Sequence, residues 1–277
     1  MNASAFPPHL AAMRYRAVFI SDVHLGTRGC RSDFLADFLR KISCDKLYLV
    51  GDIIDGWRLR RSWYWDEAHD EVVRLLLRHA RSSTEVIYIP GNHDEMIRSW
   101  MPHFVTTGLE FAGIKMRRDA VHITADNRRL LVMHGDEFDN VIRYARFLAL
   151  LGDWAYSVAL TLNRYFNAVR RRLGLPYWSL SQWLKRQVKG AVKAIDRFEV
   201  ALASEARRRG LDGVVCGHIH QAEMRDIGGV LYINDGDWVE SCTALVEHHD
   251  GRLELVDWAA LNRLSFYAPR NVVAAPA

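Results

Sequence analysis

Short apolar segments that run directly into glycine, aspartate or asparagine constrain the fold of this chain more than any other feature. Three of them lie in the first half, Arg16–Ser21, Lys46–Val50 and Glu85–Ile89, and they are rich in β-branched and aromatic residues. This composition predicts buried strands. Between them, Ser32–Lys41 and Ser62–Arg81 carry apolar residues at helical spacing. The alternation predicts βαβ units whose strands present polar side chains at their carboxyl ends.

The second half of the chain contains further strand-like segments. They are Val121–Thr124, Arg129–His134, Gly213–Cys216, Val230–Asn234, Thr243–His248 and Arg252–Asp257. The pair Asp250-Gly251 predicts a tight hairpin turn between the last two. At 277 residues, 49% of them hydrophobic, the chain is long enough to bury a substantial core. We therefore expect an α/β fold in one large domain with an insertion.

The interval 140–209 differs from the rest of the chain. It shows helical patterning without strand signals and contains 14 Lys and Arg against 4 Asp and Glu, whereas the other residues contain 23 against 29. The interval is therefore basic and the remainder is acidic. We predict a helical cap insertion at 140–209 in a core formed by 16–139 and 210–260, with a flexible extension at 1–15 and a tail at 261–277.

Five polar motifs follow predicted strands: Asp22-Val-His24, Gly51-Asp52-Ile-Ile-Asp55, Gly91-Asn92-His93-Asp94, His134-Gly135-Asp136 and Gly217-His218-Ile219-His220. Each fragment alone is common on protein surfaces, but five in this order indicate a site. Residues two apart in a strand face the same side, so Asp22 and His24 are expected to present paired ligands, as are His218 and His220. Seven oxygen and nitrogen ligands suit two divalent cations that share a carboxylate and hold a hydroxide for attack on phosphorus. Glycines before three of these ligands allow tight loops near the ions.

Together these motifs resemble the signature of the calcineurin-like metallophosphoesterases, over nearly the whole chain from Ala17 to Val256. The resemblance implies a four-layer αββα sandwich of two mixed sheets, with the site at the carboxyl ends of the strands. It implies one metal ion held by Asp22, His24, Asp52 and His220, and a second held by Asp52, Asn92, His134 and His218. Asp52 would bridge the two ions. Ligands without thiolate suit manganese, our first expectation, or iron or zinc.

His93 and Asp94 follow the expected ligand Asn92. Neighbouring residues on a tight loop point apart, so His93 is expected to face the substrate when Asn92 faces a metal ion. We predict that His93 protonates a leaving oxygen or binds a phosphate oxygen, and that Asp94 fixes the tautomer of His93. A plain loop histidine is the alternative for His93.

Two basic and aromatic stretches bear on the substrate. Apolar residues are interspersed with arginines over 143–172, and a second stretch, Trp57–Trp65, begins two residues after Asp55. A cap of this kind suits acyl chains together with a phosphate or an anionic membrane surface. The alternatives are a helix hairpin that packs on itself for the first stretch, and a partly packed helix start for the second.

The segments Asn163–Val192 and Asn234–Ser241 resemble the UDP-2,3-diacylglucosamine hydrolases of lipid A biosynthesis, which carry a helical cap in the same interval. The resemblance implies hydrolysis of a nucleotide-linked, lipid-linked pyrophosphate to UMP and a lipid monosaccharide phosphate. That branch has arginine after the metal-binding asparagine, where this chain has His93. Two alternatives stay open: a broader phosphodiesterase or nucleotide phosphatase, and a catalytically inactive scaffold that binds membrane or protein partners.

Other sequence features bear on location and partners. The first fourteen residues lack the sustained apolar run of a signal peptide, and no segment reaches the roughly 20 apolar residues that cross a bilayer. The four cysteines form no C-x-x-C pair, which favours a reducing compartment. We expect a cytoplasmic protein with peripheral contact at the inner membrane face. Nucleic acid is not an expected partner, because the arginines of the insertion are mixed with large apolar residues.

Overall fold

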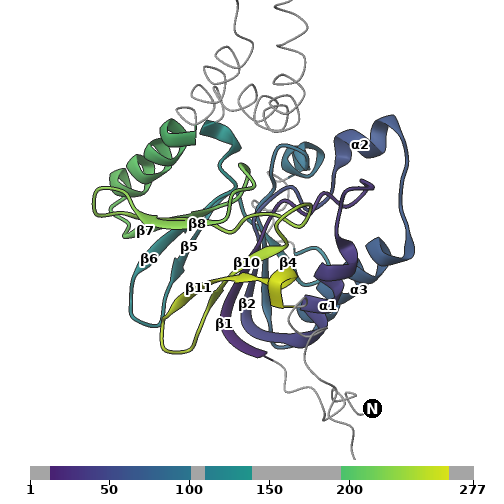
Figure 1. Ribbon diagram of the computed structural model, residues 1–277, viewed down its shortest axis with the longest axis horizontal. Helices are drawn as coiled ribbons and strands as arrows, with labels where there is room; N and C mark the ends of the chain where they lie inside the picture. The colour runs from purple at the N-terminus through teal and green to yellow at the C-terminus, as the bar shows by residue number, and fades with distance from the viewer. Residues whose placement is uncertain (1–12, 101–109, 139–194, 262–277) are drawn as a thin grey trace, which may run out of the picture.

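The computed structural model describes residues 13–100, 110–138 and 195–261, and within them two mixed β-sheets pack face to face (Figure 1). The first sheet contains β1 (Met13–Ile20), β2 (Ile42–Leu49), β3 (Glu85–Tyr88), β4 (Ile114–Met116), β10 (Thr243–Glu247) and β11 (Leu253–Asp257), in the order β11-β10-β1-β2-β3-β4. The second contains β5 (Ala120–Ile123), β6 (Arg129–Val132), β7 (Gly213–Cys216), β8 (Glu223–Asp226) and β9 (Leu231–Asn234), in the order β5-β6-β7-β9-β8.

The central strands of each sheet run parallel. In the first sheet β1, β2, β3 and β4 pair parallel, and in the second β6, β7 and β9 do so. Parallel strands need crossover connections, and α1 (Ser32–Lys41) and α3 (Glu67–Ala80) lie in two of them. Because the carboxyl ends of parallel strands meet at one edge, the loops after β1, β2 and β3 gather there.

Apolar side chains fill the space between the two sheets. Phe19 of β1 stacks on Tyr48 of β2 with ring centroids 4.7 Å apart. The same buried layer contains Val132 and Ile233 from the second sheet. On the outer face of the first sheet, α1 and α3 bury residues such as Phe38. This division follows from the alternation of side chains along each strand.

A helix over residues 195–208 covers the outer face of the second sheet. Its Phe198 and Leu202 are buried in one cluster with Tyr232 of β9. The prediction that this end of the insertion belongs to the cap is therefore wrong, because apolar residues four positions apart make it the fourth layer of the core. The rest of the predicted cap, over residues 140–194, lies outside the described residues.

The predicted helix over Ser62–Arg81 is shorter in the structure, where α3 begins at Glu67, and a separate short helix, α2 (Gly56–Arg61), precedes it. The side chains of Asp55 and Asp66 precede them, and each accepts a hydrogen bond from a backbone N–H three residues later. Such N-caps satisfy amides that the helix leaves without partners. The chain between the two helices is extended, which places α2 beside the strand-end loops (Figure 1).

The αββα layering and the order of the predicted strands are confirmed, but some boundaries differ. Strand β1 begins at Met13, inside the predicted extension at 1–15. The short strands β4 and β8 lie at sheet edges and were not predicted. In the described parts of the chain, no helix is both long enough and apolar enough to cross a membrane.

Candidate metal centre

The polar motifs of the sequence come together at the edge where the parallel strands end. Three groups of possible metal ligands occur within the described residues, and inside each group the donor atoms lie within 4.8 Å of one another. The groups are Asp22, His24 and His220; His24, Asp52 and His93; and Asp52, His134 and His218. Because His24 and Asp52 each belong to two groups, the three groups form one continuous site.

Five of the predicted ligands have a left-handed backbone. Their φ angles are 50° at Asp22, 54° at His24, 53° at Asp52, 71° at His218 and 53° at His220. Residues other than glycine adopt this conformation rarely and keep it only where the surroundings fix it. Asp22 and His24 belong to one ligand group as expected, but the alternation of side chains along a strand is not the reason. Both lie beyond β1, in turns held by bonds from Asp22 N to Gly51 O (3.0 Å) and from His24 N to Asp52 O (2.9 Å).

Two glycines permit the close approach of these loops. A Cβ atom at Gly91 would overlap the carboxylate of Asp52, and one at Gly217 would overlap Ser21 and Asp22. Glycine is the residue that leaves this space free. The predicted role of the glycines in bringing backbone close to the site is consistent with these contacts.

The first part of the site is built from Asp22, His24 and His220. His220 Nε2 lies 2.8 Å from Asp22 Oδ1 and 3.3 Å from His24 Nε2. The other oxygen of Asp22 accepts a hydrogen bond from His218 N at 2.7 Å. His24 Nδ1 lies 3.2 Å from Asp55 Oδ2, so its N–H is directed at that carboxylate. This bond leaves Nε2 of His24 to face the cluster.

The second part of the site is centred on Asp52 and His134. His134 Nδ1 donates to the carbonyl oxygen of Val50 at 2.8 Å, which directs its Nε2 toward Asp52 Oδ2 at 3.4 Å. The same Oδ2 lies 3.9 Å from His24 Nε2. The rings of His134 and His218 have centroids 5.1 Å apart. Asp52 thus lies between the two parts of the site, where a bridging ligand is expected.

Opposite charges inside the site shift its pKa values. Burial alone would raise the pKa of each carboxyl and lower that of each imidazole. Against burial, His220 brings the pKa of Asp22 well below its usual range, and His134 lowers the pKa of Asp52 to about 2. The carboxylates in turn raise the pKa of His24 to about 9 and that of His134 to about 10. The carboxylates therefore draw positive charge into the site, and a bound cation would take the place of the protons on these imidazoles.

The donor set fits two divalent cations. The buried Oδ1 of Asn92 has no hydrogen-bond partner within the described residues, and such an oxygen calls for an explanation. A cation beside it would supply one. Carboxylate, amide and imidazole donors suit manganese, iron or zinc. One ion would be held by Asp22, His24, Asp52 and His220, and the other by Asp52, Asn92, His134 and His218.

His93 lies beside the clusters with its side chain 24% exposed. Its Nδ1 lies 3.1 Å from Asp55 Oδ1, and its ring centroid lies 4.3 Å from that of Trp57. Asp55 therefore contacts His93 with one oxygen and His24 with the other. Sequence reasoning gave Asp55 no role, although its place three residues after Asp52 in G-D-x-x-D was an available signal.

Asp94 was predicted to fix the tautomer of His93, but the carboxylate beside Nδ1 of His93 is that of Asp55. Asp94 is buried, and its oxygens accept hydrogen bonds from the backbone N–H groups of Ile54 (3.0 Å), Ile53 (3.2 Å) and Gly91 (3.3 Å). Burial, together with the charge of Asp52, raises the pKa of Asp94 to about 6. Asp94 ties the loop after β3 to the loop after β2, and its contribution is to loop structure.

Ser21 and Asp235 lie behind Asp22 and were also missed by sequence reasoning. Ser21 Oγ lies 2.7 Å from Asp22 Oδ2 and 2.6 Å from Asp235 Oδ1. Burial raises the pKa of Asp235 well above its usual range. Ser21 thus links the carboxyl group of Asp235 to that of Asp22. Asp22 is thereby held in place from behind.

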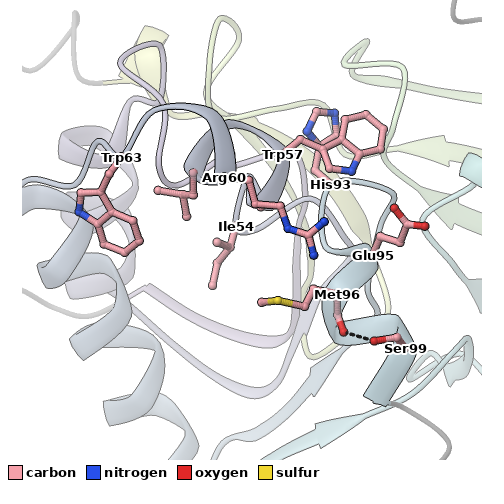
Figure 2. Close-up of a pocket in the computed structure, with 10 residues that line it drawn as sticks. Ile54, Trp57, Arg60, Trp63, His93, Glu95, Met96 and Ser99 are labelled. Carbon is pink, nitrogen blue, oxygen red and sulfur yellow. Dashed lines mark hydrogen bonds between the residues drawn. The ribbon is translucent and has the colours of Figure 1, made fainter.

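Among the described residues, two cavities adjoin His93. The first has a volume of about 480 Å³ and is lined mainly by apolar side chains: Ile54, Trp57, Leu59, Trp63 and Met96. Figure 2 shows Trp57 lying against His93, and Trp63 at the far end of this cavity. The second has a volume of about 520 Å³ and is lined by polar side chains that include His24, His220, Arg28, Arg58 and Tyr64. The site is therefore bordered by an apolar and a cationic space.

Comparison with known proteins identifies the family. Residues 15–222, about three quarters of the chain, match the family described as calcineurin-like phosphoesterase. The chain belongs to this family. It is accordingly a metal-dependent hydrolase of phosphoester bonds, and divalent metal ions are the cofactors of the family. The candidate clusters of the phosphoesterase provide side chains for them.

Relatives of the phosphoesterase include two UDP-2,3-diacylglucosamine hydrolases. That of Chromohalobacter salexigens is 26% identical over 76% of this chain and 81% of its own length. The enzyme of Neisseria meningitidis serogroup B is 25% identical over 80% of this chain and 89% of its own length. The DNA polymerase II small subunit of Methanothermobacter thermautotrophicus is 27% identical over 47% of this chain, which spans only 32% of that protein. Among solved structures, an archaeal phosphodiesterase aligns over 87% of this chain with a TM-score of 0.41 and 12% identity.

Proposed function

We propose that this phosphoesterase hydrolyses the pyrophosphate bond of a substrate of the UDP-2,3-diacylglucosamine type, releasing UMP and a lipid monosaccharide phosphate. The observation that carries the proposal is a donor set for two metal ions next to an apolar cavity, with His93 bordering both. The similarity to two UDP-2,3-diacylglucosamine hydrolases over most of their length supports the same substrate class.

The protein's own part in this reaction is to fix the positions of the ligands. When bound, the two cations lower the pKa of a water molecule and offset the charge that develops on the phosphoryl oxygens. Asp55 and the carbonyl group of Val50 hold His24 and His134 so that Nε2 of each imidazole faces inward. Ligands held in this way do not have to rearrange as the reaction proceeds.

His93 is the proposed general acid. Its Nδ1 lies 3.1 Å from Asp55 Oδ1, which leaves Nε2 as the nitrogen available to the substrate. A ring protonated at both nitrogens would transfer the Nε2 proton to the leaving oxygen as the bond to phosphorus breaks. Trp57 lies against one face of the ring and restricts its rotation. Asp55 is thus a positioning residue for the acid as well as for His24.

The apolar cavity is the proposed site for part of the lipid. Trp63 is 75% exposed and Met96 is 57% exposed, so two large apolar side chains of this cavity face solvent. Contiguous exposed apolar surface is typical of a binding site. Each methylene group of a substrate that is buried there would contribute about 0.8 kcal/mol.

The substrate proposal is tested by a product assay. The purified protein is incubated with manganese and, separately, with UDP-2,3-diacylglucosamine, nucleoside diphosphates and cyclic nucleotides. We expect UMP from the first, with a kcat/KM at least about tenfold above the others, because burial of the acyl chains adds binding energy. Equal turnover of plain nucleotides would instead support the broader phosphodiesterase. Bound metal without turnover of any of them would support the scaffold.

A matched pair of variants tests the cavity itself. Trp63→Ser removes an exposed aromatic side chain from the cavity, and Trp100→Ser removes one, 59% exposed, that does not line it. Trp63→Ser should raise KM for the lipid-linked substrate by about tenfold and leave a small aryl phosphodiester unaffected. The same change in KM for both variants would contradict a lipid site in this cavity.

The surroundings of the enzyme are also part of the proposal. We infer that the metal is manganese and that the enzyme is cytoplasmic. We also infer peripheral contact with an anionic membrane surface, which the exposed Trp63 beside Arg60 supports. Metal analysis of protein purified without added metal tests the first inference. Sedimentation with anionic and neutral vesicles tests the membrane contact, and equal binding to both would contradict it.

A further inference from the structure

The polar cavity beside His93 joins the metal-ligand clusters to two arginines. His24 and His220 line its inner wall, whereas Arg28 and Arg58 lie on exposed parts of the loop after β1 and of α2. A group bound to the clusters can therefore extend into this cavity without leaving the protein surface. None of the roles assigned above uses the two arginines.

Arg28 is held in a defined orientation by Tyr64. Its guanidinium carbon lies 4.5 Å from the centroid of the Tyr64 ring. Stacking on an aromatic face restricts the guanidinium while its N–H groups, which lie in the guanidinium plane, stay available. Arg28 therefore presents a planar set of donors suited to the oxygens of a phosphate group.

The positive charges of this cavity are not neutralised within the described residues. No ion pair there involves Arg28 or Arg58. Asp55 is the carboxylate among the lining residues, but its oxygens already contact His24, His93 and the backbone N–H of Arg58. Two guanidinium groups next to a phosphoryl-transfer site favour an anion there.

We propose that this cavity binds the second phosphate of the substrate, the one that the nucleophile does not attack, with Arg28 and Arg58 as specificity-determining residues. This inference rests on the proposed function and extends it, since it assigns the enzyme to substrates with two linked phosphates. A substrate with a single phosphate would reach the clusters but leave both arginines unused. The selectivity for pyrophosphates over simple phosphodiesters then originates in this cavity.

Calorimetric binding to the manganese-loaded full chain tests the proposal without requiring turnover. The probes are UMP and uridine 5′-(α,β-methylene)diphosphate, which has a second phosphate and resists cleavage. Arg28→Gln and Arg58→Gln should each weaken binding of the diphosphate by about tenfold, the usual loss for a charge-assisted hydrogen bond, and change UMP binding little. Arg61→Gln is the matched control, because Arg61 lies on α2 but does not line the cavity.

Three outcomes would overturn the proposal: wild-type protein that binds the diphosphate no tighter than UMP, equal losses for both probes in the arginine variants, or a loss as large in Arg61→Gln. Failure of the proposed function looks different. In that case the lipid-linked substrate is not cleaved, while the arginines still discriminate between the two probes. Metal content equal to wild type confirms that each variant retains the fold and the clusters.

Discussion

The two sides of the active site are built in different ways. On the ligand side, Asp22, Asp52 and His134 are at most 2% exposed. Backbone hydrogen bonds join the loop after β1 to the loop after β2, and Asp22 and Asp52 have a left-handed backbone. On the substrate side, His93 and Met96 are partly or largely exposed and border cavities. The ligand side is fixed by the strands of both sheets, whereas the substrate side depends on two short segments, 54–64 and 93–99.

This difference separates the chemistry of the enzyme from its selectivity. Four of the ligands, Asp22, His24, Asp52 and His134, have a second polar atom bonded to a neighbour, so a change there disturbs several groups at once. Apart from Asp55, which contacts the ligand His24, the substrate side consists of side chains that can change without moving the metal ligands. Variants on the ligand side should therefore lose metal and activity together, and variants of the other substrate-side residues should keep the metal.

The largest effect is expected for Asp52→Asn. The variant keeps the shape of the side chain and suits the left-handed backbone, but it removes the charge between the two clusters. Hydrolysis of any phosphodiester should fall by more than about 100-fold, because mutation of a residue that only supports a metal ligand already costs up to about 100-fold. Bound metal should fall with activity. Elemental analysis and steady-state kinetics measure both. Asp45→Asn, an exposed carboxylate, is the control, and full activity in Asp52→Asn would exclude the shared-ligand assignment.

A smaller effect, without loss of metal, is expected for His93→Gln. A general acid contributes about 10²- to 10⁴-fold to the rate, so kcat on an alkyl leaving group should fall within that range. An aryl substrate with a good leaving group needs no proton and should be affected much less. Rates on the two substrates at constant metal content measure the difference. An equal loss on both would remove His93 from the role of acid.

Asp55→Asn and Asp94→Asn distinguish the two carboxylates near His93. Asp55 contacts both His24 and His93, so its variant should lose about 10- to 100-fold in manganese affinity or activity. Asp94 bonds backbone amides, so its variant should mainly lower the melting temperature. Titration with manganese and thermal unfolding measure the two effects. If Asp94→Asn has the larger effect on metal affinity, the positioning role belongs to Asp94 after all.

The smallest effect on activity, within about twofold, is expected for Glu247→Gln, because it lies at the opposite end of the strands. Glu247 is fully buried and accepts hydrogen bonds from Arg16 (2.8 Å), the backbone of Ala125 (2.7 Å) and His122 (2.7 Å). Breaking this charged network should lower the free energy of unfolding at pH 7 by about 1.5–3 kcal/mol.

The pH dependence of that loss follows from the pKa of Glu247. Burial raises this pKa, but the hydrogen bonds from His122, the backbone of Ala125 and Arg16, with the charge of His122, together outweigh burial, and the pKa lies below its usual value of 4.5. The extra free energy of unfolding of the wild-type protein is therefore complete above the pKa that Glu247 has in the unfolded chain. It is lost as the pH falls through the lower pKa that Glu247 has in the folded protein. Urea unfolding of both proteins between pH 7 and 3 measures it. A constant difference across that range would contradict the charged network.

Much of the site was predictable because each motif is local. The strand ends that carry Asp22, Asp52 and His134 are set by apolar runs followed by glycine or aspartate, and the structure brings all three together. The predicted helix Ser32–Lys41 has the same bounds as α1 for the same reason. The four-layer sandwich followed from the resemblance of the motifs to a known family and is confirmed.

The misses are contacts that depend on distant parts of the chain or on side-chain rotation. Ser21 and Asp235 are 214 positions apart, so no local pattern links them. Asp55 and Asp94 each end a polar motif that follows a strand, so the sequence alone does not show which carboxylate contacts His93. The contact depends on how the two loops turn. The exposed strand β8 has no apolar alternation that would mark it.

The left-handed turns that carry the ligands also determine how this site can be altered or transferred. An alanine at Asp22 or Asp52 would add backbone strain to the loss of a ligand, so an alanine scan would overstate the importance of each side chain; asparagine tolerates this conformation better. A designer who grafts this centre onto another scaffold has to reproduce the turns as well as the residues. In such a scaffold, extended strand ends with the same side chains would point Asp22 and His24 elsewhere.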